Sequence, residues 1–171
     1  MNEIWNHVDR APLRSSYDEW IERIAATHGG ANHVINEQTW FQQLTKPLAD
    51  SKLALVTTAG AHLDDQEAFH VETTAGDASF RLIPDDVRLD RIRFTHTHYD
   101  TSSANEDPNV VLPLDALHAA VATGQVGSAS AVHVGMMGFN PDPGEVAARS
   151  GPAIAALLGD HEVDVAVLVP G

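Results

Sequence analysis

Short apolar runs alternate with amphipathic stretches along most of the chain. Residues 53–58 read Leu-Ala-Leu-Val-Thr-Thr and are followed closely by a glycine, which is typical of a buried strand that enters a loop. Similar runs predict further strands at residues 79–83, 92–95 and 128–132. Residues 163–169 are nearly all apolar and rich in valine, so we expect a central strand there.

Helical patterns separate these predicted strands. Residues 113–122 begin with a proline and are followed by a glycine at 124, and residues 144–158 follow a Pro-Asp-Pro entry. Near the N-terminus, apolar residues at spacings of three and four predict a helix at 16–27. A second short helix is expected at 37–44.

This alternation predicts an α/β fold with three layers, in which a mostly parallel, doubly wound sheet is covered on both faces. We divide the chain into a helical N-terminal extension at residues 1–45 and an α/β domain at residues 46–171. In such sheets, ligands bind beyond the carboxyl ends of the strands. That rule selects four loops as the site, those after Thr58, Thr95, Val132 and Val169.

The charge of the chain restricts its partners. The 24 acidic and 10 basic side chains give a formal net charge of -14, which repels nucleic-acid phosphates and anionic lipid headgroups. No apolar run approaches the roughly 18 residues that span a bilayer. The N-terminus also lacks the pattern of a signal peptide. We therefore expect a cytoplasmic protein that binds neither nucleic acid nor membrane.

The chain contains no cysteine and 10 histidines. Disulfides, thiolate zinc sites and cysteine nucleophiles are therefore excluded within these residues. Chemistry inside the chain must use imidazole, carboxylate, hydroxyl and backbone groups. The loops that carry histidine are the candidate site for that reason.

The loop after the first predicted strand carries Thr58 and His62. Gly60 lies between them and allows a tight turn, which would leave the hydroxyl and the imidazole facing a crevice. The alternative is that the threonine caps the turn and that His62 is merely exposed. The sequence leaves both interpretations open.

A second loop carries His96, His98 and Asp100. The two histidines are two residues apart and project to the same face of an extended chain, which suits metal ligation or polar contact with a substrate. Asp100 could be a further ligand or could orient one imidazole. The segment resembles the start of the metallo-β-lactamase signature, except that Thr101 stands where that family has a histidine. A divalent metal site, a polar substrate site and a structural network all remain open.

A third loop, residues 133–142, begins with His133 and contains two glycines that let the backbone approach a ligand. The helix expected after it offers amide donors suited to a carboxylate. The methionines and the phenylalanine of this loop are more often core residues. Neither GxGxxG nor GxxxxGK[ST] occurs in the chain, which disfavours nucleotide binding.

Six segments in order carry a resemblance to a known family. They are residues 53–69 with their Thr-Thr-Ala-Gly, residues 76–84 with Asp77 and Arg81, the His-Tyr-Asp-Thr of residues 98–101, and residues 107–117, 133–143 and 164–171. Together they are similar to the selenoprotein B family of the glycine, sarcosine, betaine and D-proline reductases. The resemblance extends from about residue 46 to the end of the chain.

The resemblance implies a subunit that works with partner reductase subunits to cleave a carbon–nitrogen bond in a small amino-acid or betaine-type substrate. In that family the nucleophile is a selenocysteine or cysteine that lies just after the strand matching residues 163–169. The sequence stops at Gly171. We expect that a selenocysteine codon was read as a stop, and reading the coding sequence beyond this position tests the idea.

No catalytic residue is assigned within the chain. The expected substrate-binding residues are Thr58, His62, Arg81, His96, His98, Asp100 and His133. Among the charged and histidine side chains, His62, His96, His98 and Asp100 come first, and Asp77, Arg81 and His133 are second choices. Arg81 is suited to hold a carboxylate through two hydrogen bonds. One alternative is a metal-dependent hydrolase or lyase that uses His96, His98 and Asp100. The other is a noncatalytic assembly subunit, and in either case we expect a homo-oligomer.

Overall fold

The structure is a computed structural model that describes residues 42–72, 76–96, 99–141 and 143–171. All of them lie in one compact unit, Asn36–Gly171. The helix expected at residues 16–27 lies outside the described residues, as does most of the helix expected at 37–44. The prediction of a helical N-terminal extension therefore stays a prediction.

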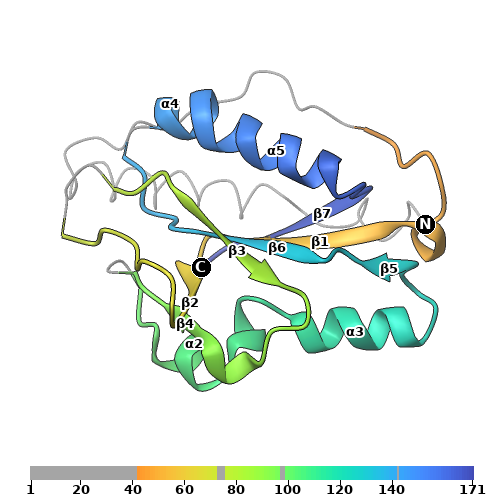
Figure 1. Cartoon of the computed structure of the whole chain (residues 1–171), viewed down its shortest axis with the longest axis horizontal. Helices are drawn as coiled ribbons and strands as arrows, with labels where there is room; N and C mark the ends of the chain where they lie inside the picture. The colour runs from red at the N-terminus through yellow and green to blue at the C-terminus, as the bar shows by residue number, and fades with distance from the viewer. Residues whose placement is uncertain (1–41, 73–75, 97–98, 142) are drawn as a thin grey trace, which may run out of the picture. The chain divides into compact units, whose positions relative to one another are not determined.

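A mixed sheet forms the centre of this unit (Figure 1). β1 pairs in parallel with β7 on one side, and with the short β5 and then β6 on the other. β3 runs antiparallel to β6 and forms one edge. The predicted α/β class with a mostly parallel sheet is confirmed. The strands of this sheet are β1 (Lys52–Thr57), β3 (Phe80–Pro84), β5 (Ser128–Ala129), β6 (Val132–Met136) and β7 (Val165–Val169).

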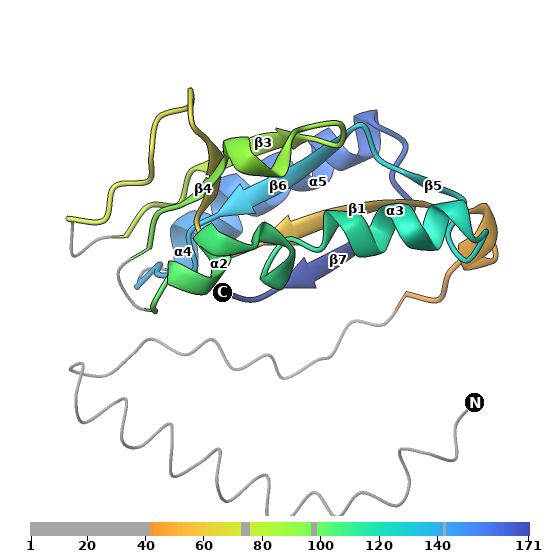
Figure 2. The same cartoon turned by 90° about the horizontal axis from the view of Figure 1, so that it is seen from below.

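Helices cover both faces of the sheet (Figures 1 and 2). One face is covered by α3 (Leu114–Ala122). The other face is covered by a longer helix composed of α4 (Pro143–Glu145), the π-helical turn η5 (Val146–Ser150) and α5 (Gly151–Asp160). Both helices were expected at these places, and they complete the three layers.

The alternation of side chains along β1 divides the core into two parts. Leu53 and Leu55 pack in the cluster that contains the buried residues of α3, whereas Ala54 and Val56 pack with α5. All four side chains are buried. Because helices cover both faces of β1, side chains on both faces must be apolar, and the run therefore shows no polar alternation.

The last strand differs from the expectation. Within the described residues β7 pairs with β1 alone, so it is an edge strand and not a central one. Leu168 is 74% exposed, and the strand as a whole is exposed or half-buried. The apolar composition of residues 163–169 correctly predicted a strand, but composition does not report how many neighbours a strand has.

The strand expected at residues 128–132 is interrupted and longer than predicted. β5 ends at Ala129, and β6 begins at Val132 and continues to Met136. The loop at the carboxyl end of β6 therefore begins at Met137, and not after Val132 as expected. The histidine and glycine of β6 had been interpreted as loop residues.

A second, two-stranded sheet lies beside the first. β2 (Ala61–Leu63) and β4 (Ile92–Phe94) pair antiparallel, so the strand expected at 92–95 does not belong to the main sheet. Among the described residues, no helix is long and apolar enough to cross a membrane. The remaining short elements are η2 (Leu48–Asp50), η3 (Leu89–Arg91), α2 (Ser102–Glu106) and η4 (Pro108–Val110).

Candidate functional site

The loops at the carboxyl ends of three strands meet. Thr58, directly after β1, donates its N–H to the carbonyl of Val169 in β7 at 3.0 Å. The N–H of Gly60 donates to the carbonyl of Met136 in β6 at 2.7 Å. The N–H of Gly171 donates to Thr58 Oγ1 at 3.2 Å. We define the carboxyl-end rim as the residues that contact one another here, which are Thr58, Ala59, His96, Tyr99, Gly138 and Gly171.

Gly60 brings the end of β4 to this rim. Its φ is +78°, which favours glycine, and a β-carbon there would lie 2.1 Å from the carbonyl oxygen of Thr95. The N–H of Thr95 in turn donates to the carbonyl of Gly60 at 3.0 Å. The close approach of the two backbones is what places the next residue, His96, beside the loop after β1.

The His96 side chain reaches the loop after β6. A β-carbon added at Gly138 would lie 3.4 Å from His96 Nε2 and 3.1 Å from the carbonyl oxygen of Thr58. The His96 ring lies 4.8 Å from the ring of Tyr99, measured between centroids. Two of the expected residues, Thr58 and His96, are therefore brought together, and the glycine at 138 leaves room for them.

Tyr99 and Asp100 are each fixed by hydrogen bonds. The Tyr99 hydroxyl donates to the carbonyl of Ala59 at 2.8 Å, and burial raises the pKa of this phenol, so that it stays neutral and donating. Asp100 Oδ1 accepts the N–H of Ser102 at 2.9 Å, at the start of α2. The hydrogen bonds from Ser102 lower the pKa of Asp100. His98 lies outside the described residues.

His62 lies within the fold and not in an open crevice. The side chain is buried, and its Nδ1 donates to the carbonyl of Leu63 at 2.8 Å. Its Nε2 then accepts from the hydroxyl of Thr95, also at 2.8 Å. The Nδ1 bond thus stays within β2, and the Nε2 bond fastens β2 to Thr95, which follows β4 directly and precedes His96.

His133 is fully buried inside the sheet. Leu55 donates its backbone N–H to His133 Nδ1 at 3.0 Å, and His133 Nε2 donates to Asp85 Oδ1 at 2.9 Å. The imidazole thus supplies an acceptor to β1 at the interruption between β5 and β6. The exposed His118 contacts the same carboxylate oxygen at 2.8 Å. The structure therefore places His133 away from the carboxyl-end rim, in a hydrogen-bond network of the core.

The Arg81 side chain contacts the loop that precedes β3. Its Nε donates to the carbonyl of Glu67 at 2.7 Å and its Nη1 to Ser79 Oγ at 2.8 Å. The guanidinium carbon also lies 4.6 Å from the centroid of the Phe69 ring, a cation–π contact. Arg81 holds this loop in place through these contacts, and the carboxylate binding expected of it stays a prediction.

Asp77 stands in the same loop and is held in its charged form. Its carboxylate accepts the backbone N–H groups of His70 and Ser79, each at 2.9 Å, and the hydroxyl of Ser79 at 2.5 Å. Burial alone would raise the pKa of Asp77, but these hydrogen bonds and the charge of Arg81 lower it overall. A buried negative charge is therefore fixed at this position at neutral pH.

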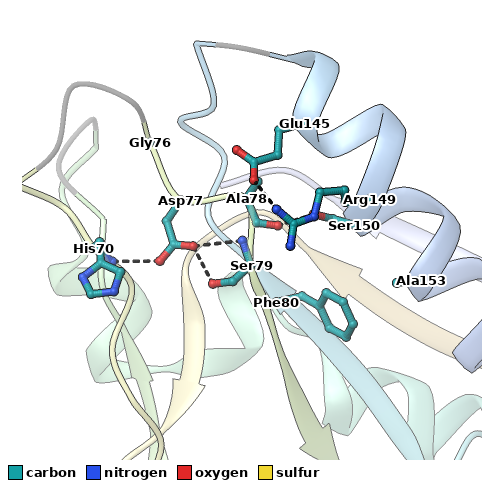
Figure 3. Close-up of a pocket in the computed structure, with 10 residues that line it drawn as sticks. All are labelled: His70, Gly76, Asp77, Ala78, Ser79, Phe80, Glu145, Arg149, Ser150 and Ala153. Atoms are coloured by element: carbon teal, nitrogen blue, oxygen red, sulfur yellow. Dashed lines mark hydrogen bonds and ion pairs between the residues drawn. The ribbon is translucent and has the colours of Figure 1, made fainter.

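A pocket of about 730 Å³ lies between this loop and the helix that contains the π-helical turn (Figure 3). Ser150 closes one side by donating its hydroxyl to the carbonyl of Ala78. Phe80 pairs with Met136, so the pocket lies at the carboxyl end of β6. The lining residues are His70, Gly76, Asp77, Ala78, Ser79, Phe80, Glu145, Arg149, Ser150 and Ala153.

The sequence did not indicate the helical side of this pocket. Glu145 and Arg149 are four residues apart on an expected helix, which is a detectable ion-pair spacing. Nothing in that spacing shows that the pair faces a loop about 70 residues earlier in the chain. His70 and Ser150 likewise carry no local signal, because their role depends on a contact between distant segments.

Two of the three metal ligands expected from the sequence, His96 and Asp100, are among the described residues. Among the residues that the structure describes, no three histidine or carboxylate side chains are placed to hold a metal ion. One of the expected ligands, His98, lies outside them. Metal ligation by His96, His98 and Asp100 therefore stays a prediction.

Comparison with known proteins identifies the family to which these loops belong. A family model described as glycine/sarcosine/betaine reductase selenoprotein B matches residues 35–170, a range that includes the rim up to Pro170 and the whole pocket. The D-proline reductase subunit gamma of Acetoanaerobium sticklandii is 34% identical over 128 residues. That alignment covers 75% of this chain and 52% of the relative, so the chain spans about half the length of the curated relative. No solved structure matches the chain. The resemblance predicted from the sequence is confirmed, and the chain belongs to the glycine/sarcosine/betaine reductase selenoprotein B family.

Proposed function

We propose that this chain is a reductase subunit that takes part in the reductive cleavage of a carbon–nitrogen bond in glycine, sarcosine, betaine or D-proline. The observation that carries the proposal is the family match over residues 35–170, because it includes all the strands whose loops form the carboxyl-end rim. The carboxyl ends of the strands are where α/β sheets of this kind bind their ligands. The proposal accordingly places the reaction at the rim.

The reaction consumes two electrons and two protons, since the carbon and the nitrogen each gain a hydrogen when the bond between them breaks. The chain has no cysteine, and none of its side chains performs two-electron thiol or selenol chemistry. The proposal therefore assigns the redox group to a residue outside these 171. Histidine is the side chain that most often transfers protons in catalysis, so the proposal assigns to His96 the proton that the nitrogen gains.

The exposed strand β7 favours a second candidate, that of an assembly subunit without a part in the reaction. Within the described part of the chain β7 pairs with a strand on one side alone, and Leu168 is exposed on it. An edge strand of this kind can pair with a strand of another chain. Both candidates imply partner subunits. They differ in whether side chains of the rim affect turnover once the complex is assembled.

The proposed function is tested by turnover. The chain, tagged and expressed in its native host, is purified with whatever subunits accompany it, and the cleavage of the four substrates is measured with a dithiol reductant. We expect the complex to cleave at least one of them and the isolated 171-residue chain to cleave none. A mock purification with untagged chain is the control. Turnover by the isolated chain, or no turnover of any of the four by the complex, would contradict the proposal.

A further inference from the structure

The function proposed above assigns no ligand to the pocket between the loop before β3 and the covering helix. It is nevertheless an organised feature. Gly76 has a φ of +77°, and a β-carbon there would lie 2.3 Å from the carbonyl oxygen of Phe139. The loop therefore packs directly on the segment that follows β6. A ligand in this pocket would therefore lie near the loop after β6, which also carries Gly138 of the carboxyl-end rim.

One wall of the pocket carries a fixed negative charge. Asp77 is only 8% exposed, and three hydrogen bonds from His70 and Ser79 hold its carboxylate in place. A carboxylate has about four acceptor positions. The three bonds leave capacity for one more donor, which a ligand with a charged N–H group would supply, whereas a quaternary ammonium group would be attracted by the charge alone. The ring of Phe80, which also lines the pocket, adds a surface that attracts cations.

The opposite wall carries a positive charge that is open to solvent. Arg149 donates through Nη1 to Glu145 Oε1 at 3.1 Å, and its side chain remains 79% exposed. The hydrogen bond to Glu145 orients the guanidinium group. Its other N–H donors remain accessible to an anion. Figure 3 shows Arg149 on the helix that faces the loop with Asp77. Arginine is the side chain best suited to bind a carboxylate through two parallel hydrogen bonds.

The π-helical turn places Arg149 and Ser150 at the wall of the pocket. The N–H of Gly151 bonds to the carbonyl of Val146, five residues earlier, and Pro152 has no N–H with which to continue the ordinary pattern. This wider turn includes Arg149 and Ser150, both of which line the pocket. Ser150 fixes the turn to the loop through its bond to Ala78. Such single π-helical turns are frequent at functional sites.

We propose that this pocket binds a small zwitterion of the amino-acid type, with its carboxylate at Arg149 and its positively charged nitrogen between Asp77 and the ring of Phe80. The apolar surfaces of Ala78 and Ala153 would contact the carbon atoms between the two charges. The volume lies within the range of small-molecule sites. The inference rests on the proposed function, because it assigns to that reaction a binding site for its substrate.

Binding is measured by calorimetric titration of the full chain with D-proline, with betaine and with pyrrolidine, which has the cation but no carboxylate. We expect Arg149→Gln to weaken the binding of D-proline and betaine roughly 10- to 100-fold, the effect of losing a charge-assisted contact, and to leave pyrrolidine unchanged. Asp77→Asn should weaken all three ligands. If that variant fails to fold, Phe80→Leu tests the cationic end on its own.

Arg88→Gln is the matched control, because Arg88 is 78% exposed, pairs with Asp90, and does not line the pocket. It should bind all three ligands as the unchanged chain does. Equal D-proline affinity in the Arg149→Gln and unchanged chains, or no measurable binding of D-proline and betaine, would overturn the inference. Turnover by the complex with an unchanged KM in Arg149→Gln would also overturn it, and would leave the proposed function intact. Binding that depends on Arg149, in a complex that cleaves no substrate, would support the inference and contradict only the proposed function.

Discussion

Replacing Gly60 by alanine is expected to lower the free energy of unfolding by roughly 2 to 5 kcal/mol. A non-glycine residue at a φ of +78° costs about 1–2 kcal/mol. The added β-carbon would also lie 2.1 Å from the carbonyl oxygen of Thr95, and relief of such a clash typically costs about 1–3 kcal/mol more. Because the clash is with backbone, Thr95 and the adjacent His96 must move away from the rim. Urea denaturation measures the change.

Gly124→Ala is the matched control for this substitution. Gly124 has a similar φ of +71°, but no atom lies within 4 Å of the position of its β-carbon. Only the cost of placing a non-glycine residue at a positive φ should remain, about 1–2 kcal/mol of unfolding free energy. Equal losses of stability at the two positions would show that the close approach of Gly60 to Thr95 is absent, and that His96 is not held at the rim in this way.

The second large effect is expected at His133. His133→Leu should cost roughly 2 to 4 kcal/mol in unfolding free energy, although leucine is apolar and of similar size. The substitution leaves the buried N–H of Leu55 without its acceptor and removes one hydrogen-bond donor from Asp85. An unsatisfied buried polar group costs about 1–3 kcal/mol. His118→Ala should cost less than about 1 kcal/mol, because His118 is the exposed partner of the same carboxylate.

The same histidine makes stability depend on pH. Burial lowers the pKa of His133 from its ordinary value of 6.5, although Asp85 partly opposes the shift. Below about pH 6.5 the unfolded chain therefore binds a proton at this residue that the folded chain does not. Stability should fall as the pH is lowered from 7 toward the pKa of folded His133. Thermal unfolding at several pH values should show this fall, and His133→Leu should flatten it. An equal fall in the variant would assign the effect to other groups.

The parts of the fold that the sequence predicts well are those with a local cause. The run at residues 53–58 has no polar alternation because helices cover both faces of β1, so its burial is visible in the composition. α3 begins and ends where its proline and glycine indicate. The Thr58 and His96 loops were predicted to meet, and they do.

The parts that the sequence did not predict depend on contacts between distant segments. Whether β7 is central or at an edge depends on its neighbours and not on its composition. His133 was interpreted as a loop residue, because the local sequence does not show that its ring accepts a hydrogen bond from the backbone of β1. The pocket combines Asp77 with Arg149, 72 positions apart, through a contact that no local pattern indicates.

The central claim is that the carboxyl-end rim is where the reduction takes place. Its most direct test is the kcat/KM of the assembled complex that contains His96→Gln, compared with His118→Gln as a histidine substitution on the outer helix α3. Thermal unfolding of both variants confirms that each is folded. We predict a fall of roughly a hundredfold or more for His96→Gln, the usual contribution of a proton-transfer group, and little change for His118→Gln. A complex with His96→Gln that works as fast as the unchanged complex would contradict the account.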